Sequence, residues 1–167
     1  MTTYAPDLPD MISTPTATTV ATVVVTARTT DGLRPLLDAV LAQSTTTDLL
    51  VVLDRTAEGG AAEVLDALAG SDIAVRVIGQ PDEIGVRAAV TALLATPDIV
   101  PDEALLWLLP AGVVPHSDAL ALLVAAHRRS TAVVAAGPKL LDATDPRVLR
   151  SVGIQATSSG RLVQEPA

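Results

Sequence analysis

The chain alternates between short apolar runs and stretches in which apolar residues recur every three or four positions. Continuous apolar runs are typical of strands buried on both faces of a parallel sheet. A spacing of three to four is typical of helices with one buried face. The expected strands are 20–25, 49–53, 73–78, 105–109 and 132–136, and the expected helices are 33–41, 61–69, 85–95 and 119–129.

Residues that start or stop helices stand at the ends of these segments. Asp31, Asp82 and Ser117 each precede an expected helix and can cap its N-terminus. Pro35 is tolerated because it falls in a first helical turn, and Pro97 ends the helix before it. The helix boundaries are therefore predicted by side-chain chemistry as well as by periodicity.

The order of the segments predicts the fold class. Strands that alternate with helices at this spacing favour an α/β fold with a mostly parallel central sheet flanked by helices. Near the C-terminus, a helical turn after Asp145-Pro146 is expected to lead into a strand over 152–157. The Ser158-Ser159-Gly160 turn then predicts a terminal hairpin.

Two regions of the chain differ in composition. Residues 1–18 are rich in Thr, Pro and Asp without an apolar period, which predicts a flexible N-terminal arm. Residues 19–167 are expected to form one domain, since 49% of the chain is apolar and the mean hydropathy is +0.45. The sequence is also compatible with a piece cut from a longer protein.

Charge and composition exclude several function classes. Lys139 is the only lysine and the net charge is −8, so binding to nucleic acid is not expected. Without cysteine there are no disulfides or thiolate sites, which suits a reducing cytosol. The longest apolar run, 104–114, is too short to span a bilayer, and the N-terminus does not resemble a signal peptide. A soluble, cytoplasmic piece is expected.

Several polar residues follow the expected strands directly. Ligands of open α/β sheets bind beyond the carboxyl ends of the strands, where Thr26, Arg28, Asp54 and 110–112 should gather. Asp54 could accept hydrogen bonds from a ribose hydroxyl or a base imide, and Arg28 could offset phosphate charge. The alternative is that Asp54 is a turn residue and Arg28 a solvated loop charge.

Five segments in order resemble a known family. They are Val23-Val24-Val25-Thr26, a helix ending in Ala42-Gln43, Val51-Val52-Leu53-Asp54, the Gly- and Ala-rich 85–95, and 115–120 followed by 136–142. Together these segments resemble the N-terminal, nucleotide-binding half of a family 2 glycosyltransferase with the Rossmann-like GT-A fold. The resemblance implies that Thr26 closes the first strand, that Asp54 contacts the nucleoside and that Gly85 opens the helix under the sugar donor.

The chain departs from this family where its chemistry lies. The family holds Mg²⁺ or Mn²⁺ with an Asp-x-Asp motif, but here Pro110-Ala111-Gly112 offers no side-chain oxygen, so no metal cofactor is expected. Glu83 stands where the family has asparagine, and it would repel a diphosphate. His116 is a lone histidine beside a helix cap and is interpreted as structural or solvated. The family's catalytic base normally lies downstream of this half, so no catalytic residue is named.

Three functions remain open. The first is a degenerate, non-catalytic glycosyltransferase-like domain that acts as a scaffold or regulator in cell-envelope polysaccharide assembly. The second is an active transferase that is metal-independent or incomplete, taking a sugar from a nucleotide-diphosphate donor. The third is an acidic protein-interaction domain that self-associates through an apolar patch. Possible partners are a weakly bound nucleotide-sugar, a second copy, another protein, or a transmembrane region of a longer chain at the cytosolic face of a membrane.

Overall fold

The computed structural model describes residues 20–25, 30–56, 60–66, 68–80, 85–96, 98–100, 104–153, 155–156 and 162–163. The chain divides into two compact units. The sheet unit comprises Met1–Leu33 and Thr47–Gly112, and the hairpin unit comprises Arg34–Thr46 and Val113–Ala167. The expected arm, 1–18, lies outside the described residues.

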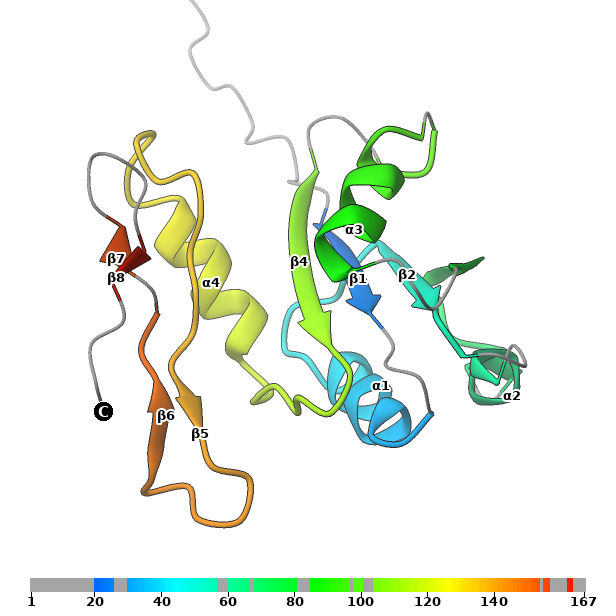
Figure 1. The fold of residues 1–167 in the computed structure, drawn as a ribbon, viewed down its shortest axis with the longest axis horizontal. Coiled ribbons are helices and arrows are strands. Elements are labelled where there is room, and N and C mark those ends of the chain that lie inside the picture. The colour runs from blue at the N-terminus through cyan, green and yellow to red at the C-terminus, as the bar shows by residue number, and fades with distance from the viewer. Residues whose placement is uncertain are drawn as a thin grey trace, which may run out of the picture. The chain divides into compact units, whose positions relative to one another are not determined.

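The sheet unit is built on four parallel strands (Figure 1). In chain order they are β1 (Val20–Val25), β2 (Leu49–Asp54), β3 (Ala74–Gly79) and β4 (Leu105–Pro110), and in space their order is β3-β2-β1-β4. Two helices of this unit, α2 (Ala61–Asp66) and α3 (Val86–Leu94), alternate with the strands along the chain. The predicted α/β fold class with a parallel sheet is therefore confirmed, and four predicted strands lie within one residue of their expected bounds.

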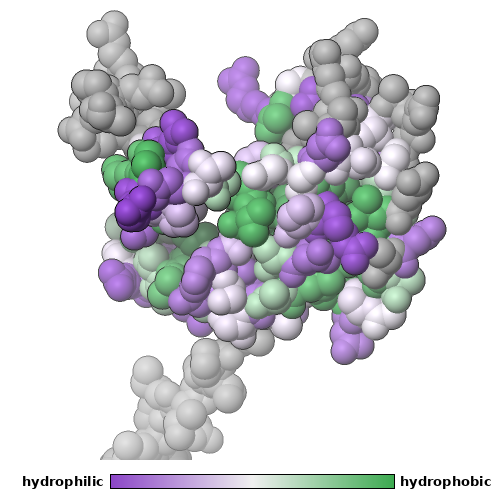
Figure 2. Space-filling model, turned by 90° about the horizontal axis from the view of Figure 1, so that it is seen from below, coloured by the Kyte–Doolittle hydropathy of each residue, from purple (hydrophilic) through white to green (hydrophobic). Residues whose placement is uncertain are grey.

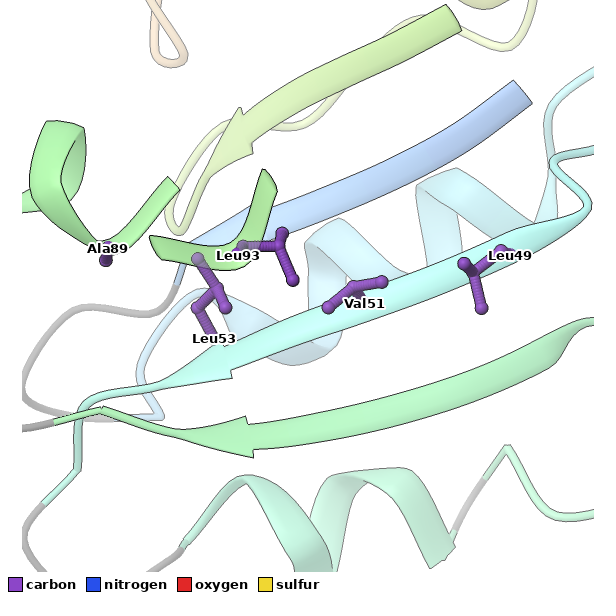
Figure 3. Close-up of a cluster of buried hydrophobic side chains, with 5 residues drawn as sticks. All are labelled: Leu49, Val51, Leu53, Ala89 and Leu93. Carbon is purple, nitrogen blue, oxygen red and sulfur yellow. The ribbon is translucent and has the colours of Figure 1, made fainter. Parts of the chain in front are cut away.

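Strand β2, which has β1 on one side and β3 on the other, is buried along its whole length. All six of its residues are buried. Leu49, Val51 and Leu53 alternate along it and so point to one face, where Ala89 and Leu93 of helix α3 pack against them (Figure 3). Apolar side chains on both faces of this strand explain why its sequence is a continuous apolar run rather than an alternating one.

Polar contacts hold the start of the sheet in register. The Val20 amide donates to the Asp48 carboxylate at 2.8 Å, and the Asp48 amide donates to the Val20 carbonyl at 3.0 Å. The buried Thr47 hydroxyl also donates to that carbonyl, at 2.7 Å. These bonds join the first residue of β1 to the residues before β2, and they satisfy backbone groups that the ladder leaves over.

The hairpin unit contains two helices and two short antiparallel ladders. Helix α1 spans Leu33–Leu41, with its first residue assigned to the sheet unit, and helix α4 spans Ala119–His127. β5 (Leu140–Leu141) pairs with β6 (Leu149–Ser151), and β7 (Gln155–Ala156) pairs with β8 (Leu162–Val163). The β7–β8 ladder confirms the predicted C-terminal hairpin, whereas its expected turn, 158–160, lies outside the described residues.

One buried side chain ties the end of α1 to the start of α4. The Gln43 amide nitrogen donates to the Ala39 carbonyl at 3.0 Å and to the His116 carbonyl at 2.8 Å. Its oxygen accepts from the Leu120 amide at 3.0 Å, and the Ser44 amide donates to the Ser117 carbonyl at 2.7 Å. Gln43 thus satisfies an otherwise unpaired amide in the first turn of α4.

The expected strand over 132–136 is wrong. These residues form a turn and an irregular segment, and Val134 is 91% exposed. An apolar run becomes a strand only when a neighbouring strand satisfies its backbone groups, and no ladder in the described part of the chain includes it. The five consecutive apolar residues at 132–136 therefore did not predict a buried strand, whereas the similar run in β2 did.

Two of the three predicted caps are wrong, and the cap predicted at Asp31 stays a prediction. Helix α4 has Asp118 rather than Ser117 at its N-cap, and α3 has Gly85 there, with Asp82 outside the described residues. Neither N-cap makes a side-chain capping hydrogen bond.

Helix α2 ends three residues before the expected Ala69, because hydrogen bonds of the i to i−3 type convert its end into tight turns. None of the helices in the described ranges is long and apolar enough to cross a membrane.

Candidate functional site

The carboxyl ends of the strands form one edge of the sheet unit. Strand β1 lies between β2 and β4, with Val25 opposite both Leu53 and Pro110. After β1 the chain adds β2 and β3 on one side and then places β4 on the other. This reversal between β1 and β4 is the position at which open α/β sheets bind ligands. The turn Pro110–Gly112 leaves β4 at that position.

The side chains of this turn determine what the edge can bind. Divalent cations of the hard type take oxygen ligands, mainly carboxylates. Pro110, Ala111 and Gly112 carry no side-chain oxygen. No group of three or more acidic, histidine or cysteine side chains suited to a metal ion occurs among the described residues. The side chains of Pro110–Gly112 therefore offer no ligand to the Mg²⁺ or Mn²⁺ of the family that the sequence resembles.

Asp54 ends β2 at the same edge, and its carboxylate is used by the turn that follows. The side chain is buried, at 4% exposure. One oxygen accepts from the Thr56 amide at 2.8 Å and from the Thr56 hydroxyl at 2.6 Å. The other accepts from the Ala61 amide at 3.4 Å, at the start of α2. These contacts favour the interpretation of Asp54 as a turn residue, and its contact with a nucleoside stays a prediction.

Thr56 extends this network to the next turn. Its hydroxyl donates to Asp54 and accepts from the Gly60 amide at 2.9 Å. The hydroxyl therefore links the end of β2 to the residue before α2. Sequence reasoning missed Thr56, although an Asp followed two residues later by Thr is a recognisable signal for a side-chain-stabilised turn.

The other predicted site residues have different outcomes. Thr26 and Arg28 lie outside the described residues, as does Glu83. Gly85 stands at the N-cap of α3 with φ −63°, and its carbonyl accepts from the Ala89 amide at 3.0 Å. A Cβ at this position would meet nothing within 4 Å, so the fold does not require glycine here. Its opening of the α3 helix matches the expectation, and its role toward a donor stays a prediction.

Backbone packs against backbone at the reversal point. Gly32, in the turn before α1, has φ +76°, and a Cβ there would lie 2.9 Å from the Gly112 Cα. On the other side, the Thr30 methyl would lie 3.1 Å from a Cβ on Gly60. Thr30 and Gly32 thus lie close to the residue before α2 and to the turn after β4, respectively. Sequence reasoning overlooked Gly32, since a single glycine before a helix is common.

His116 and Asp118 form a pair at the start of α4. The His116 Nδ1 lies 2.6 Å from an Asp118 carboxylate oxygen, and both side chains are exposed. The His116 carbonyl is held by Gln43. These contacts give both residues a local structural role, in keeping with the interpretation of His116 as structural or solvated.

The loop between β5 and β6 carries two carboxylates that are each paired with an arginine. One Asp142 oxygen accepts from the Thr144 hydroxyl at 2.5 Å and from the Thr144 amide at 2.8 Å, and the other pairs with Arg150. These bonds, that of the Thr144 hydroxyl first, hold the pKa of the Asp142 carboxyl well below its usual range. Arg147 likewise lowers the pKa of Asp145. Both carboxylates stabilise the loop and leave little capacity for a ligand.

Comparison with known proteins adds no assignment to this geometry. No protein-family model matches the chain, and none of the curated proteins matches it.

Proposed function

We propose that this chain is a degenerate domain of the family 2 glycosyltransferase type that does not catalyse sugar transfer. Its role would be that of a scaffold or regulator in cell-envelope polysaccharide assembly, at the cytosolic side. The observation that carries the proposal is the position of Pro110–Gly112, at the carboxyl end of β4 beside the end of β1. The parallel strand order and the five resembling segments support the family, and this turn argues against its chemistry.

Transfer from a nucleotide-diphosphate sugar leaves charge on the departing diphosphate. A divalent cation held by carboxylates usually stabilises that charge in GT-A enzymes. A turn of proline, alanine and glycine cannot hold such a cation through side chains. The loss of these ligands at the edge where a donor would bind therefore supports a domain that keeps the fold without the reaction.

The donor side of the edge supports the same conclusion. A carboxylate oxygen can accept about two hydrogen bonds, and one oxygen of Asp54 already accepts two from Thr56. Little capacity is left for a ribose or a base at a buried position. Any remaining affinity for a nucleotide-sugar should therefore be weak.

The alternative of an active, metal-independent transferase rests on a different observation. Asp54 keeps its place at the end of β2, two strands from β4, as the resemblance expects. In that case the diphosphate charge would have to be offset by cationic side chains instead of a metal. Arg28, which precedes the described segment 30–56, is the sequence candidate for this role.

Calorimetric titration with UDP-, GDP- and TDP-sugars, with and without Mn²⁺, distinguishes these functions. The proposal expects weak or undetectable binding that Mn²⁺ does not change. Metal-dependent binding in the micromolar range would overturn it, and metal-independent micromolar binding would favour the alternative. A variant with Pro110→Asp and Gly112→Asp is the matched control, because a side chain at Gly112 has open space and Asp tolerates its φ of +89°. This variant should gain affinity for Mn²⁺.

A further inference from the structure

Exposed apolar side chains are unevenly distributed between the two units. Of thirteen large hydrophobic side chains that are exposed in the described residues, nine belong to the hairpin unit. Of seventeen buried hydrophobic residues, only four belong to it. The hairpin unit therefore leaves much of its apolar surface in contact with water, which is unusual for a unit that functions without a partner.

Helix α4 shows this most clearly. Eight of its nine residues are apolar, which is typical of a helix that is covered on all sides. Leu120 is its only buried residue, and Leu122 is 62% exposed. Val134, in the irregular segment after the helix, is still more exposed. Figure 2 shows apolar residues (green) that reach the surface beside hydrophilic ones (purple).

The two units also differ in charge. The hairpin unit holds seven of the eleven Lys and Arg residues but only five of the nineteen Asp and Glu residues, which gives it a formal charge of +2. The sheet unit, with the remaining four basic and fourteen acidic residues, carries −10. An apolar surface with basic residues fits an acidic protein surface, and the chain itself supplies one.

Two cations of the hairpin unit are available for such a contact. Arg147 and Arg150 are paired with Asp145 and Asp142, and Arg34 with Asp38. Arg129 and Lys139 are exposed, and neither has an ion pair within the described part of the chain.

We propose that the hairpin unit of one copy docks onto the acidic sheet unit of a second copy. The nine exposed apolar side chains offer on the order of 400 Å² of apolar surface, close to the apolar share of one partner in a standard interface. An anionic bilayer fits less well, because it would attract only the hairpin unit and repel the sheet unit at −10, whereas in a second copy the sheet unit is itself the attracting surface. The contact joins two different surfaces, so it can extend beyond a dimer. It does not depend on the function proposed above.

Sedimentation equilibrium of the full chain, from about 10 to about 500 μM, tests the proposal. The mean mass should rise with concentration, and less so at about 500 mM than at about 50 mM NaCl. Leu122→Ser with Val134→Ser should weaken association about tenfold. Arg129→Gln with Lys139→Gln should weaken it, whereas Arg34→Gln, which removes a charge already paired with Asp38, should not.

Three results would overturn the proposal. They are a monomer at every concentration, association that the Leu122 and Val134 substitutions leave unchanged, and an Arg34→Gln effect as large as that of Arg129→Gln with Lys139→Gln. Circular dichroism of each variant shows that it is folded, and these positions are exposed. A chain that stays monomeric but sediments with phosphatidylserine vesicles would assign the surface to a bilayer instead.

Discussion

Replacement of Asp54 tests whether its carboxylate serves the fold. Asp54→Ala removes the acceptor of three hydrogen bonds at a position that is 4% exposed. The Thr56 hydroxyl keeps its bond from Gly60, but the amides of Thr56 and Ala61 lose their partner. Since an unsatisfied buried group costs about 1–3 kcal/mol and the Ala61 bond is long, a loss of about 2–4 kcal/mol in unfolding free energy is expected.

Urea unfolding measures this loss. Trp107, the only tryptophan, is buried in β4 and reports by fluorescence on the sheet unit that contains Asp54. Asp54→Asn keeps an acceptor for Thr56 and should lose only about 1 kcal/mol. Asp38→Ala is the matched control, because Asp38 is exposed and its pair with Arg34 should contribute less than about 0.5 kcal/mol. A loss below about 0.5 kcal/mol for Asp54→Ala would refute the structural role.

Three further predictions concern packing, backbone conformation and pH. Leu93→Ala should lower the unfolding free energy by about 2–4 kcal/mol, whereas its exposed neighbour Leu94→Ala should lower it by less than about 0.5 kcal/mol in the same urea assay; similar losses would contradict the packing of α3 on β2. Gly32→Ala should lower the unfolding free energy by about 2–3 kcal/mol, because its Cβ would meet the Gly112 backbone at 2.9 Å. Gly112→Ala has open space around its Cβ and should lower it by only about 1 kcal/mol, for its φ of +89°. A lower urea midpoint for Gly112→Ala than for Gly32→Ala would refute the close approach. The lowered pKa of Asp142 means that its stabilising effect is complete above the ordinary value of 3.8 and is lost as pH falls through the folded pKa; the protection factors of amides in the β5–β6 loop, which compare each exchange rate with the intrinsic rate at the same pH, should therefore fall in acid, and Asp142→Asn should remove that pH dependence.

The strands were predictable where burial and pairing agree. The runs over β1, β2 and β4 are apolar apart from Thr22 and the terminal Asp54, and each has a partner in the sheet. The run over 132–136 is also apolar, but only Val133 in it is even half-buried. The pattern of apolar residues indicates how readily a segment is buried. A strand also needs a neighbouring strand with free backbone groups. Whether one is present depends on how the rest of the chain folds.

Parts of the candidate site were predictable for the same reason. The position of Asp54 at the carboxyl edge follows from the end of an apolar run, and so does that of Pro110–Gly112. The inward contacts of Asp54 depend on Thr56 and Ala61 folding back, which is set by the turn and not by the strand. The approach of Gly32 to Gly112 joins residues eighty positions apart and leaves no periodic signal.

The central claim is that the turn after β4 has lost its metal site, and paramagnetic broadening by Mn²⁺ tests it most directly. Amide resonances of ¹⁵N-labelled protein would be recorded with a UDP-sugar while Mn²⁺ is added. The account predicts that Ala111 and Gly112 broaden no more than surface amides elsewhere, and that they broaden selectively in the variant with Pro110→Asp and Gly112→Asp. Selective broadening of Ala111 and Gly112 in the unaltered chain, at substoichiometric Mn²⁺, would contradict it.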